Sequence, residues 1–486
     1  MSLAAGGHRI RVLAALFAAS ALAGCTTLGP DFHAPAAPAV GGYLSPGEAA
    51  SREVALKLGS EAAADWWTAF HSAELDALVR QAYAGNPSLA AAKASLVRAR
   101  ELARSEAGRA LPAVDSSASA QRERLNFTTF GLTFPGFPTN ADFSLYSVGA
   151  TASYSLDLFG GERRKIEGAR AQAEAQAHEL DAAYLTLAGQ VASQAAALAA
   201  LKAEIAAVNQ IIADDRRNLE LVRKAEAAGS EPRAAQVNAE SQLAADETLA
   251  PPLRQQMAVA RHALALLLGK APANWTAPEF SLDALTLPRE IPVSLPSTLV
   301  RQRPDILAAE ARLHAATAAI GATEAEAYPN VSLNAGITQS ALEPQNLFRW
   351  TSNAYNVGPS VSLPLFHGFA VKHATAAARA EAEAARAQYE ATVLRAFGQV
   401  ADLMQALAHD EEQLNAEARA EASAERGLSL ARLAYQAGGT GLFPVIDASR
   451  QLNTARLGLA RARAQRYLDA IQLFVATGRG LAKAGE

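Results

Sequence analysis

Histidines are the first residues to consider for chemistry, because imidazole can act as a base or bind a metal ion. The sequence has nine, and His367 and His373 lie where a strand pattern gives way to a helix pattern. A zinc site needs further ligands, and no Cys, Asp or Glu completes a set beside this pair. The sequence also lacks a phosphate-binding loop, a dinucleotide-binding glycine pattern and a nucleophile elbow. We therefore predict no enzyme, no metal site and no other cofactor.

Cys25, the single cysteine, ends an apolar leader. The apolar run Val12–Ala23 follows basic residues and is too short to cross a bilayer, which is typical of a secretory signal. The sequence Leu22-Ala23-Gly24-Cys25 resembles the bacterial lipoprotein signal, and the non-acidic Thr26 is usual for outer-membrane sorting. A buried thiol that behaves as a small hydrophobe is the alternative. We predict cleavage before Cys25 and lipid attachment there.

The charge and hydropathy of the chain narrow its class further. A formal net charge of −4 and a pI near 6.2 over 486 residues leave no electrostatic footprint for nucleic acid. After the leader, no segment has 18 or more consecutive apolar residues, as a membrane helix would. If the chain crosses a membrane, strands must do so.

An internal repeat sets the domain organisation. Pro87 and Pro112 return as Pro304 and Pro329, since 304 − 87 and 329 − 112 both give 217. The segment before the repeats is rich in Pro, Gly, Ala and Ser, which predicts an extended tether rather than a packed element, with the folded body starting near Trp66. We predict a signal peptide at 1–24, a lipidated tether at 25–61, and two copies of one repeat at 62–285 and 286–486.

Each copy contains two stretches in which apolar and polar residues alternate, the pattern of a strand. The longest, from Phe143 to Leu158, has 158 − 143 + 1 = 16 residues, more than the ~9–11 that a tilted strand needs to cross a bilayer. Aromatic residues gather near the strand ends, as in interfacial girdles: Phe143, Tyr146, Phe159, Phe348, Trp350, Tyr355 and Phe366. A half-buried soluble sheet is the alternative. We predict a membrane barrel to which each chain gives four strands.

Four strands cannot close a barrel, and an open edge cannot face lipid because its backbone N–H and C=O groups must be paired. The barrel must therefore be shared between chains. Two chains would give 2 × 4 = 8 strands and three would give 3 × 4 = 12, and only the larger barrel should leave a lumen. The strand count alone leaves both open.

Two long segments without an internal proline follow the strands, at Glu162–Ala228 and Ala370–Ala437. The first carries apolar residues at spacings of three, four and seven, which predicts a heptad seam in one helix of ~100 Å. Return helices are predicted at about Arg233–Leu268 and Pro444–Ala476. A solitary solvated coiled coil is the alternative, but it would not account for the strands joined to both long helices.

These features together resemble the TolC-like outer-membrane efflux family, and within it the lipoprotein branch called the OprM or NodT type. The resemblance covers about Cys25 to Leu481 and rests on the lipoprotein signal, the Gly29–Phe32 tether, Trp66-Trp67, the Asn-Pro and Arg-Pro helix starts, the duplicated unit and the closing Tyr435–Gly438. It implies an α+β membrane protein: a homotrimer with a 12-stranded β-barrel in outer-membrane lipid, continuous with a 12-helix α-barrel that extends into the periplasm. It also implies a periplasmic membrane-fusion adaptor and an inner-membrane efflux pump of the resistance-nodulation-division class as partners.

The function that the resemblance implies is a passive exit duct of a tripartite efflux system, which conducts small molecules such as drugs from the pump to the exterior. Two alternatives remain: an outer-membrane channel for type I protein secretion, and a structural coiled-coil lipoprotein that conducts nothing. Secretion channels generally lack the lipoprotein signal, and a spacer would give no current in a planar bilayer.

The resemblance also implies a periplasmic gate where each long helix turns back, formed in the second copy by Tyr435, Phe443, Asp447 and Arg450. Three Asp447 side chains would converge near the axis, where each disfavours ionisation of the others. The alternative is a solvated ion pair with Arg450, worth only ~0.3–0.5 kcal/mol.

Two departures from the family pattern weaken the aspartate part of this gate. Pro444 occupies a position where some members have a second aspartate, and Ala235 stands where an aspartate usually ties neighbouring protomers together. We therefore expect the gate to depend more on the packing of Phe443 than on bonds between protomers.

Overall fold

A computed structural model describes residues 27–48, 50–51, 55–131, 135–136 and 138–479. The chain divides into two compact units. Of the described residues, the first contains 27–34, 97–175 and 310–388, and the second contains 35–96, 176–309 and 389–479. Several helices continue from one unit into the other, and each unit is described by itself below.

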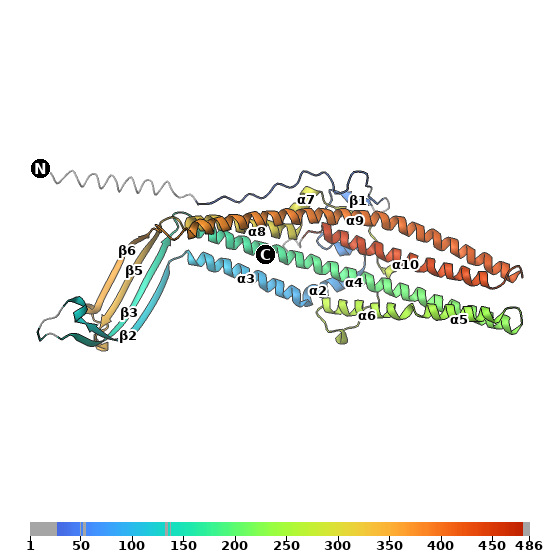
Figure 1. Ribbon diagram of the computed structural model, residues 1–486, viewed down its shortest axis with the longest axis horizontal. Helices are drawn as coiled ribbons and strands as arrows, with labels where there is room; N and C mark the ends of the chain where they lie inside the picture. The colour runs from blue at the N-terminus through green and yellow to red at the C-terminus, as the bar shows by residue number, and fades with distance from the viewer. Residues whose placement is uncertain (1–26, 49, 52–54, 132–134, 137, 480–486) are drawn as a thin grey trace. The chain divides into compact units, whose positions relative to one another are not determined.

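The first unit is built on an antiparallel sheet of four strands in the order β2-β3-β5-β6 (Figure 1). The strands are β2 (Ala113–Asn126), β3 (Asn140–Leu156), β5 (Asn330–Ala341) and β6 (Asn353–Ser362). All four predicted strands are present. Alternation of apolar and polar side chains is a local signal, so it located each strand without knowledge of its neighbours.

Strands β2 and β3 stay paired up to their ends, where Leu125 pairs with Ala141 and Asn126 with Asn140. Beside these pairs, Arg124 donates to both carboxylate oxygens of Asp142 at 2.7 Å. Bidentate charge-assisted bonds of this kind hold two strands in register up to the turn.

Helices enter and leave the sheet in the same order in both repeats. Helices α3 (Pro87–Arg109) and α8 (Pro304–Ala325) precede β2 and β5, and helices α4 (Gly161–Ala227) and α9 (Ala370–Gln436) follow β3 and β6. Both long helices have 67 residues and end within one residue of the predicted bounds. Pro87 starts α3 and Pro304 starts α8, and in the first turn of a helix a missing N–H costs no hydrogen bond.

The return helices differ between the repeats. In the second copy α10 runs unbroken from Phe443 to Thr477, as predicted. In the first copy the single helix predicted to Leu268 is wrong, because the chain forms α5 (Arg233–Glu247) and α6 (Ala250–Leu267) with a break at Thr248 and Leu249. Pro251 and Pro252 have no N–H to continue the helical ladder, so a new helix starts there.

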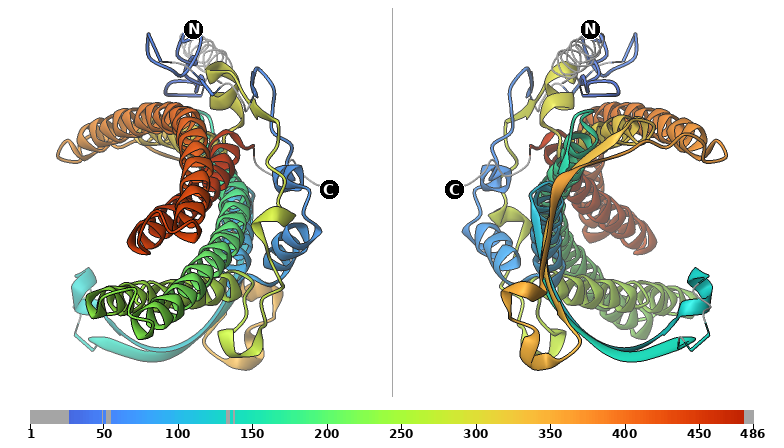
Figure 2. Two further views of the ribbon diagram at one scale, coloured as in Figure 1. Left: turned by 90° about the vertical axis from the view of Figure 1, so that its right-hand side faces the viewer. Right: turned by 90° about the vertical axis from the view of Figure 1, so that its left-hand side faces the viewer.

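In the second unit each return helix lies beside its long helix (Figure 2). In the first copy Arg223 of α4 binds Glu240 of α5 at 2.8 Å. In the second copy Arg456 of α10 lies 3.5 Å from Glu421 of α9. Apolar side chains fill the seams between the helices, including Leu219 and Val222 of α4. By length and composition, helix α4 also contains a stretch that is apolar enough to cross a membrane. Several apolar side chains of α4 are buried in the largest cluster of the second unit, which is described next.

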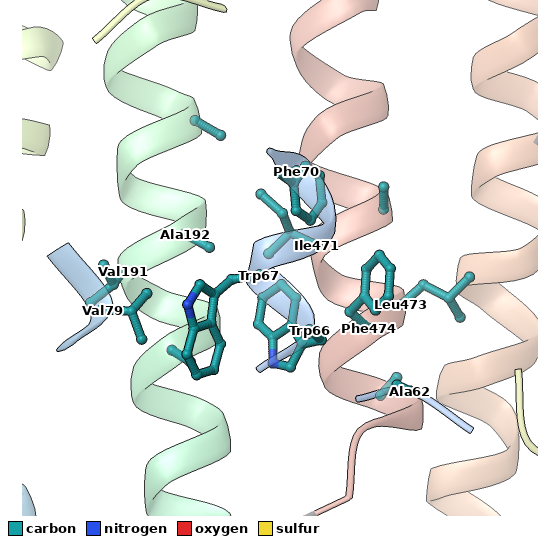
Figure 3. Packing of buried hydrophobic residues seen from close by; sticks show 14 of the residues in the cluster. Ala62, Trp66, Trp67, Phe70, Val79, Val191, Ala192, Ile471, Leu473 and Phe474 are labelled. Carbon is teal, nitrogen blue, oxygen red and sulfur yellow. The ribbon is translucent and has the colours of Figure 1, made fainter. Parts of the chain in front are cut away.

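The largest buried cluster of the second unit is centred on Trp66 and Trp67 in a short 3-10 helix (Trp66–Phe70), next to α2 (Ala73–Gly85). Trp66 stacks on Phe474 of α10, with ring centroids 5.5 Å apart (Figure 3). Trp67 donates from Nε1 to Asp76 at 3.1 Å and lies near Val191 of α4. These side chains join the amino-terminal segment to the long helices.

The segment predicted as an extended tether has no helix or strand among its described residues before residue 55, but it is packed. Tyr43 donates its hydroxyl proton to the carbonyl of Ser294 at 2.8 Å and meets Phe397 edge to face. Strand β1 (Ala55–Leu58) then pairs in parallel with β4 (Glu290–Val293), just before α7 (Pro296–Gln302). The prediction of an unpacked tether is therefore wrong, because Tyr43 and the residues of β1 hold this segment against other parts of the second unit.

Candidate functional site

Each of the two outer strands of the sheet has one edge that pairs with no other described residues. Within the part of the chain that the structure describes, strand β2 pairs only with β3, and strand β6 pairs only with β5. Unpaired N–H and C=O groups along β2 and β6 are templates for another strand. The described chain therefore presents the two edges that a barrel shared between copies requires.

The strand register gathers the apolar positions onto one face of the sheet. Ala150 lies opposite Ile337, which lies opposite Tyr355, and the next rank on the same face joins Ala152, Ala335 and Val357. Tyr355 and Val357 are each 79% exposed in the single chain. On the opposite face serine hydroxyls bond across the strands, with 3.0 Å between Ser147 and Ser340 and 3.1 Å between Ser332 and Ser360. One face suits lipid and the other suits water, as predicted.

Aromatic side chains mark the end of the sheet nearest the helices. Phe159 packs on Tyr328 with ring centroids 4.8 Å apart, and Phe366 meets Phe369 edge to face at 5.8 Å. Phe366 and Phe369 are exposed, and at the opposite end of the sheet Trp350, which precedes β6, is exposed as well. Girdles of aromatic residues flank the apolar band of outer-membrane barrels at both boundaries between lipid and water.

The residues predicted to form the gate lie together at the turn between α9 and α10. Tyr435 is half-buried in the last turn of α9, Gly438 makes the turn with φ of 74°, and Phe443 starts α10. Phe443 is 69% exposed, although it is a large apolar side chain. The turn is tied to the first-copy hairpin by Glu231, whose carboxylate accepts from the N–H of Leu442 at 3.1 Å.

The charged members of the predicted gate are satisfied within their own helix. Asp447 lies 3.7 Å from Arg450 and accepts from the side chain of Gln451 at 2.8 Å. Asp447 and Arg450 are exposed, so in one chain they form the solvated helical pair that the sequence offered as the alternative. Ala235 of α5 packs in the apolar cluster of the same hairpin end.

Two buried acid pairs between the long and return helices were not predicted. Asp215 of α4 faces Asp246 of α5, and Asp410 of α9 faces Asp469 of α10. Burial, followed by the neighbouring carboxyl, raises the pKa of Asp215 and of Asp410 to about 7. The pKa of each of these aspartates is therefore higher in the folded chain than its value of 3.8 in the unfolded chain. The contribution of each aspartate to stability is fully present below pH 3.8 and is lost as the pH rises through about 7.

His367 and His373 are both exposed, and among the residues that the structure describes no three His, Cys, Asp or Glu side chains form a group that could hold a metal ion. Cys25, the predicted lipid-attachment site, lies outside the described residues. Arg164, a buried arginine with several partners, was missed, because the run Arg163-Arg164-Lys165 resembles an ordinary solvated helix start.

Comparisons with known proteins agree with this architecture. A family model for outer membrane efflux proteins matches residues 78–270 and 295–479, one match in each repeat. The pyoverdine export outer membrane protein OpmQ of Pseudomonas aeruginosa is 28% identical over 95% of this chain and 96% of the relative. Outer membrane protein OprJ of the same organism is 29% identical over 96% of this chain and 95% of the relative.

A solved structure of the outer-membrane channel OprN matches with a TM-score of 0.85 at 28% identity, over 94% of this chain and 99% of that chain. Both the sequence repeat and the fold are therefore those that the resemblance implied. The chain belongs to the outer membrane efflux protein family and is a channel of the outer membrane that extends into the periplasm, not an enzyme.

Proposed function

We propose that three copies of this chain form one passive exit duct, in which twelve strands close a barrel in the membrane and the long helices continue the tunnel into the periplasm. The observation that carries the proposal is the four-stranded sheet with two open edges, joined directly to α4 and α9. Pairing β2 of one copy with β6 of the next satisfies the backbone groups that lipid cannot. Three copies give 3 × 4 = 12 strands, enough to leave a lumen.

Members of this family work with efflux-pump partners. We propose a resistance-nodulation-division pump in the inner membrane and a periplasmic membrane-fusion adaptor as the partners here. In this proposal the pump supplies the energy and the duct supplies a gated hydrated path. Susceptibility profiling of a deletion strain tests this role, and the proposal expects sensitivity to several small toxic compounds.

The trimer makes a direct prediction for the purified protein. In mild detergent the particle should have the mass of three chains, and in a planar bilayer it should conduct ions. Light scattering coupled to size exclusion measures the protein mass without the detergent. A monomeric or dimeric mass would rule out the twelve-stranded barrel, and a trimer without current would favour a structural spacer.

We further propose that Cys25 carries the lipid anchor of the mature chain, after removal of residues 1–24, and that the anchor assists assembly rather than conduction. A single acyl chain binds a membrane only marginally, whereas several bind it stably. The barrel inserts by itself once it has closed. We therefore expect Cys25→Ser to slow sorting and lower the yield of trimer, while the trimers that form conduct normally. Unacylated trimers without current would contradict this prediction.

A further inference from the structure

Arg164 in the first turn of α4 is a buried charge whose partners come mostly from the amino-terminal segment. Its side chain is 5% exposed. The guanidinium donates from Nε to the carbonyl of Leu28 at 3.0 Å and from Nη2 to the carbonyl of Gly29 at 3.3 Å and to Asp31 at 2.7 Å. It also donates from Nη1 to Glu167 at 2.8 Å. A buried arginine is tolerated only when its donors are paired, so removing the segment would leave a charge with lost partners.

Glycines let the segment approach the helices at backbone distance. Gly29 has φ of +81°, and a Cβ there would collide with the backbone of Gly321 in α8. A Cβ on Gly321 would in turn collide with the carbonyl oxygen of Leu28, which Arg164 binds. By contrast, a Cβ on Gly168 of α4 would meet only ordinary contacts, the nearest at 3.6 Å. The fit therefore depends on particular glycines.

An aromatic contact completes the site. Phe32 stacks on His314 of α8 with ring centroids 4.4 Å apart. Nε2 of His314 lies 2.8 Å from Glu167, which also accepts from Arg164. Side chains of α4 and α8 thus bind the main chain of this short segment, the carboxylate of Asp31 and the ring of Phe32. We call Arg164, Glu167, His314 and Gly321 the clasp.

The clasp holds the segment at the turn between sheet and helix. The N–H of Leu28 donates to the carbonyl of Phe159 at 3.1 Å, and Thr27 lies against Gly160. Phe159 belongs to the aromatic pair that marks the end of the sheet. Cys25 precedes Thr27 by two residues, a reach of ~7 Å. The lipid chains on an acylated Cys25 would therefore begin close to the level at which the sheet ends.

We propose that the clasp is a binding site for the chain's own amino-terminal segment, and that it fixes the point at which the lipid anchor enters the membrane relative to the sheet. This inference rests on the anchor role proposed for Cys25. Without the clasp, the next packed side chain among the described residues of the segment is Ala37. A flexible tether of that length spans roughly 17–21 Å, so the anchor would no longer hold the sheet at one depth.

Matched glycine variants test whether the segment is bound. Gly29→Ala changes only the segment, with Gly41→Ala as its control, because a Cβ on Gly41 meets nothing within 4 Å. Gly321→Ala changes the helix side, with Gly168→Ala as its control. In the intact trimer, chymotrypsin should cut after Phe32 at least ten-fold faster in Gly29→Ala and Gly321→Ala than in native protein or either control. Equal cutting in all five proteins would overturn the clasp.

Combination with Cys25→Ser tests what the clasp is for. Pulse-chase labelling in cells measures the rate of trimer assembly in the outer membrane. Gly29→Ala should slow assembly to the rate of Cys25→Ser, and the double variant should be no slower than Cys25→Ser alone. If Gly29→Ala slows assembly by the same factor with and without Cys25, the clasp acts independently of the anchor and the inference is wrong. If Cys25→Ser alone has no effect, the proposed anchor role fails, and the chymotrypsin result still decides whether the clasp exists.

Discussion

Replacing Phe443 and Asp447 together with alanine is expected to raise the resting conductance of the purified channel several-fold. Phe443 starts α10 at the hairpin turn and is 69% exposed in the single chain. A large apolar side chain left in water at the end of a hairpin favours burial against other copies. If three copies converge there, three phenyl rings and three carboxylates narrow the entrance, and their removal widens it.

The contacts within one chain suggest how the effect divides between the two residues. Asp447 already interacts with Arg450 and Gln451 in its own helix, and Pro444 and Ala235 supply no further carboxylate. Most of the change should therefore come from Phe443→Ala, with a smaller addition from Asp447→Ala. Cells that carry the double variant should also become sensitive to large antibiotics that enter through the leak.

Single-channel recording at low voltage measures the resting state directly. Val237→Ala is a suitable control, because Val237 is an exposed apolar residue on the first-copy hairpin that has no predicted gate role. Changes at Val237 or Ala235 should alter conductance little. Unchanged conductance in the double variant would place the constriction elsewhere in the channel.

The strands and long helices could be predicted because their signals are local. Alternation along 140–156 and the absence of proline along 161–227 need no information about distant residues. The i, i+3 pair of Asp447 and Arg450 was equally accessible, since helix geometry places those residues on one face. Its position relative to other copies depends on contacts outside the chain, so the gate itself stays a prediction.

The features that were missed depend on contacts between distant segments. Strands β1 and β4 have four residues each and pair across more than 200 positions of sequence, which no periodicity reveals. Arg164 stands between Arg163 and Lys165, and only the bound segment distinguishes it from them. The break between α5 and α6 is different, because Pro251 and Pro252 were visible in the sequence and should have ended the predicted helix.

Trp66→Ala should strongly destabilise the core of the second unit. Trp66 is 2% exposed, and its ring lies nearly parallel to that of Phe474 on α10, with 15° between the ring planes (Figure 3). It also meets Phe70 edge to face at 6.4 Å, and Phe70 packs on Phe474 in turn. Truncation of such a ring leaves a cavity that costs about 3–5 kcal/mol of unfolding free energy.

Trp66→Phe provides the matched control, because the indole nitrogen contributes nothing that the smaller ring would lose. Nε1 of Trp66 is buried without a hydrogen-bond partner among the described residues, so Phe removes an unsatisfied donor while it keeps an aromatic ring against Phe474. We expect Trp66→Ala to lower the midpoint of thermal unfolding, followed by circular dichroism at 222 nm, by roughly 5–15 °C, and Trp66→Phe to lower it far less. Equal losses in the two variants would mean that the indole's size, rather than an aromatic ring against α10, holds the amino-terminal segment in the core.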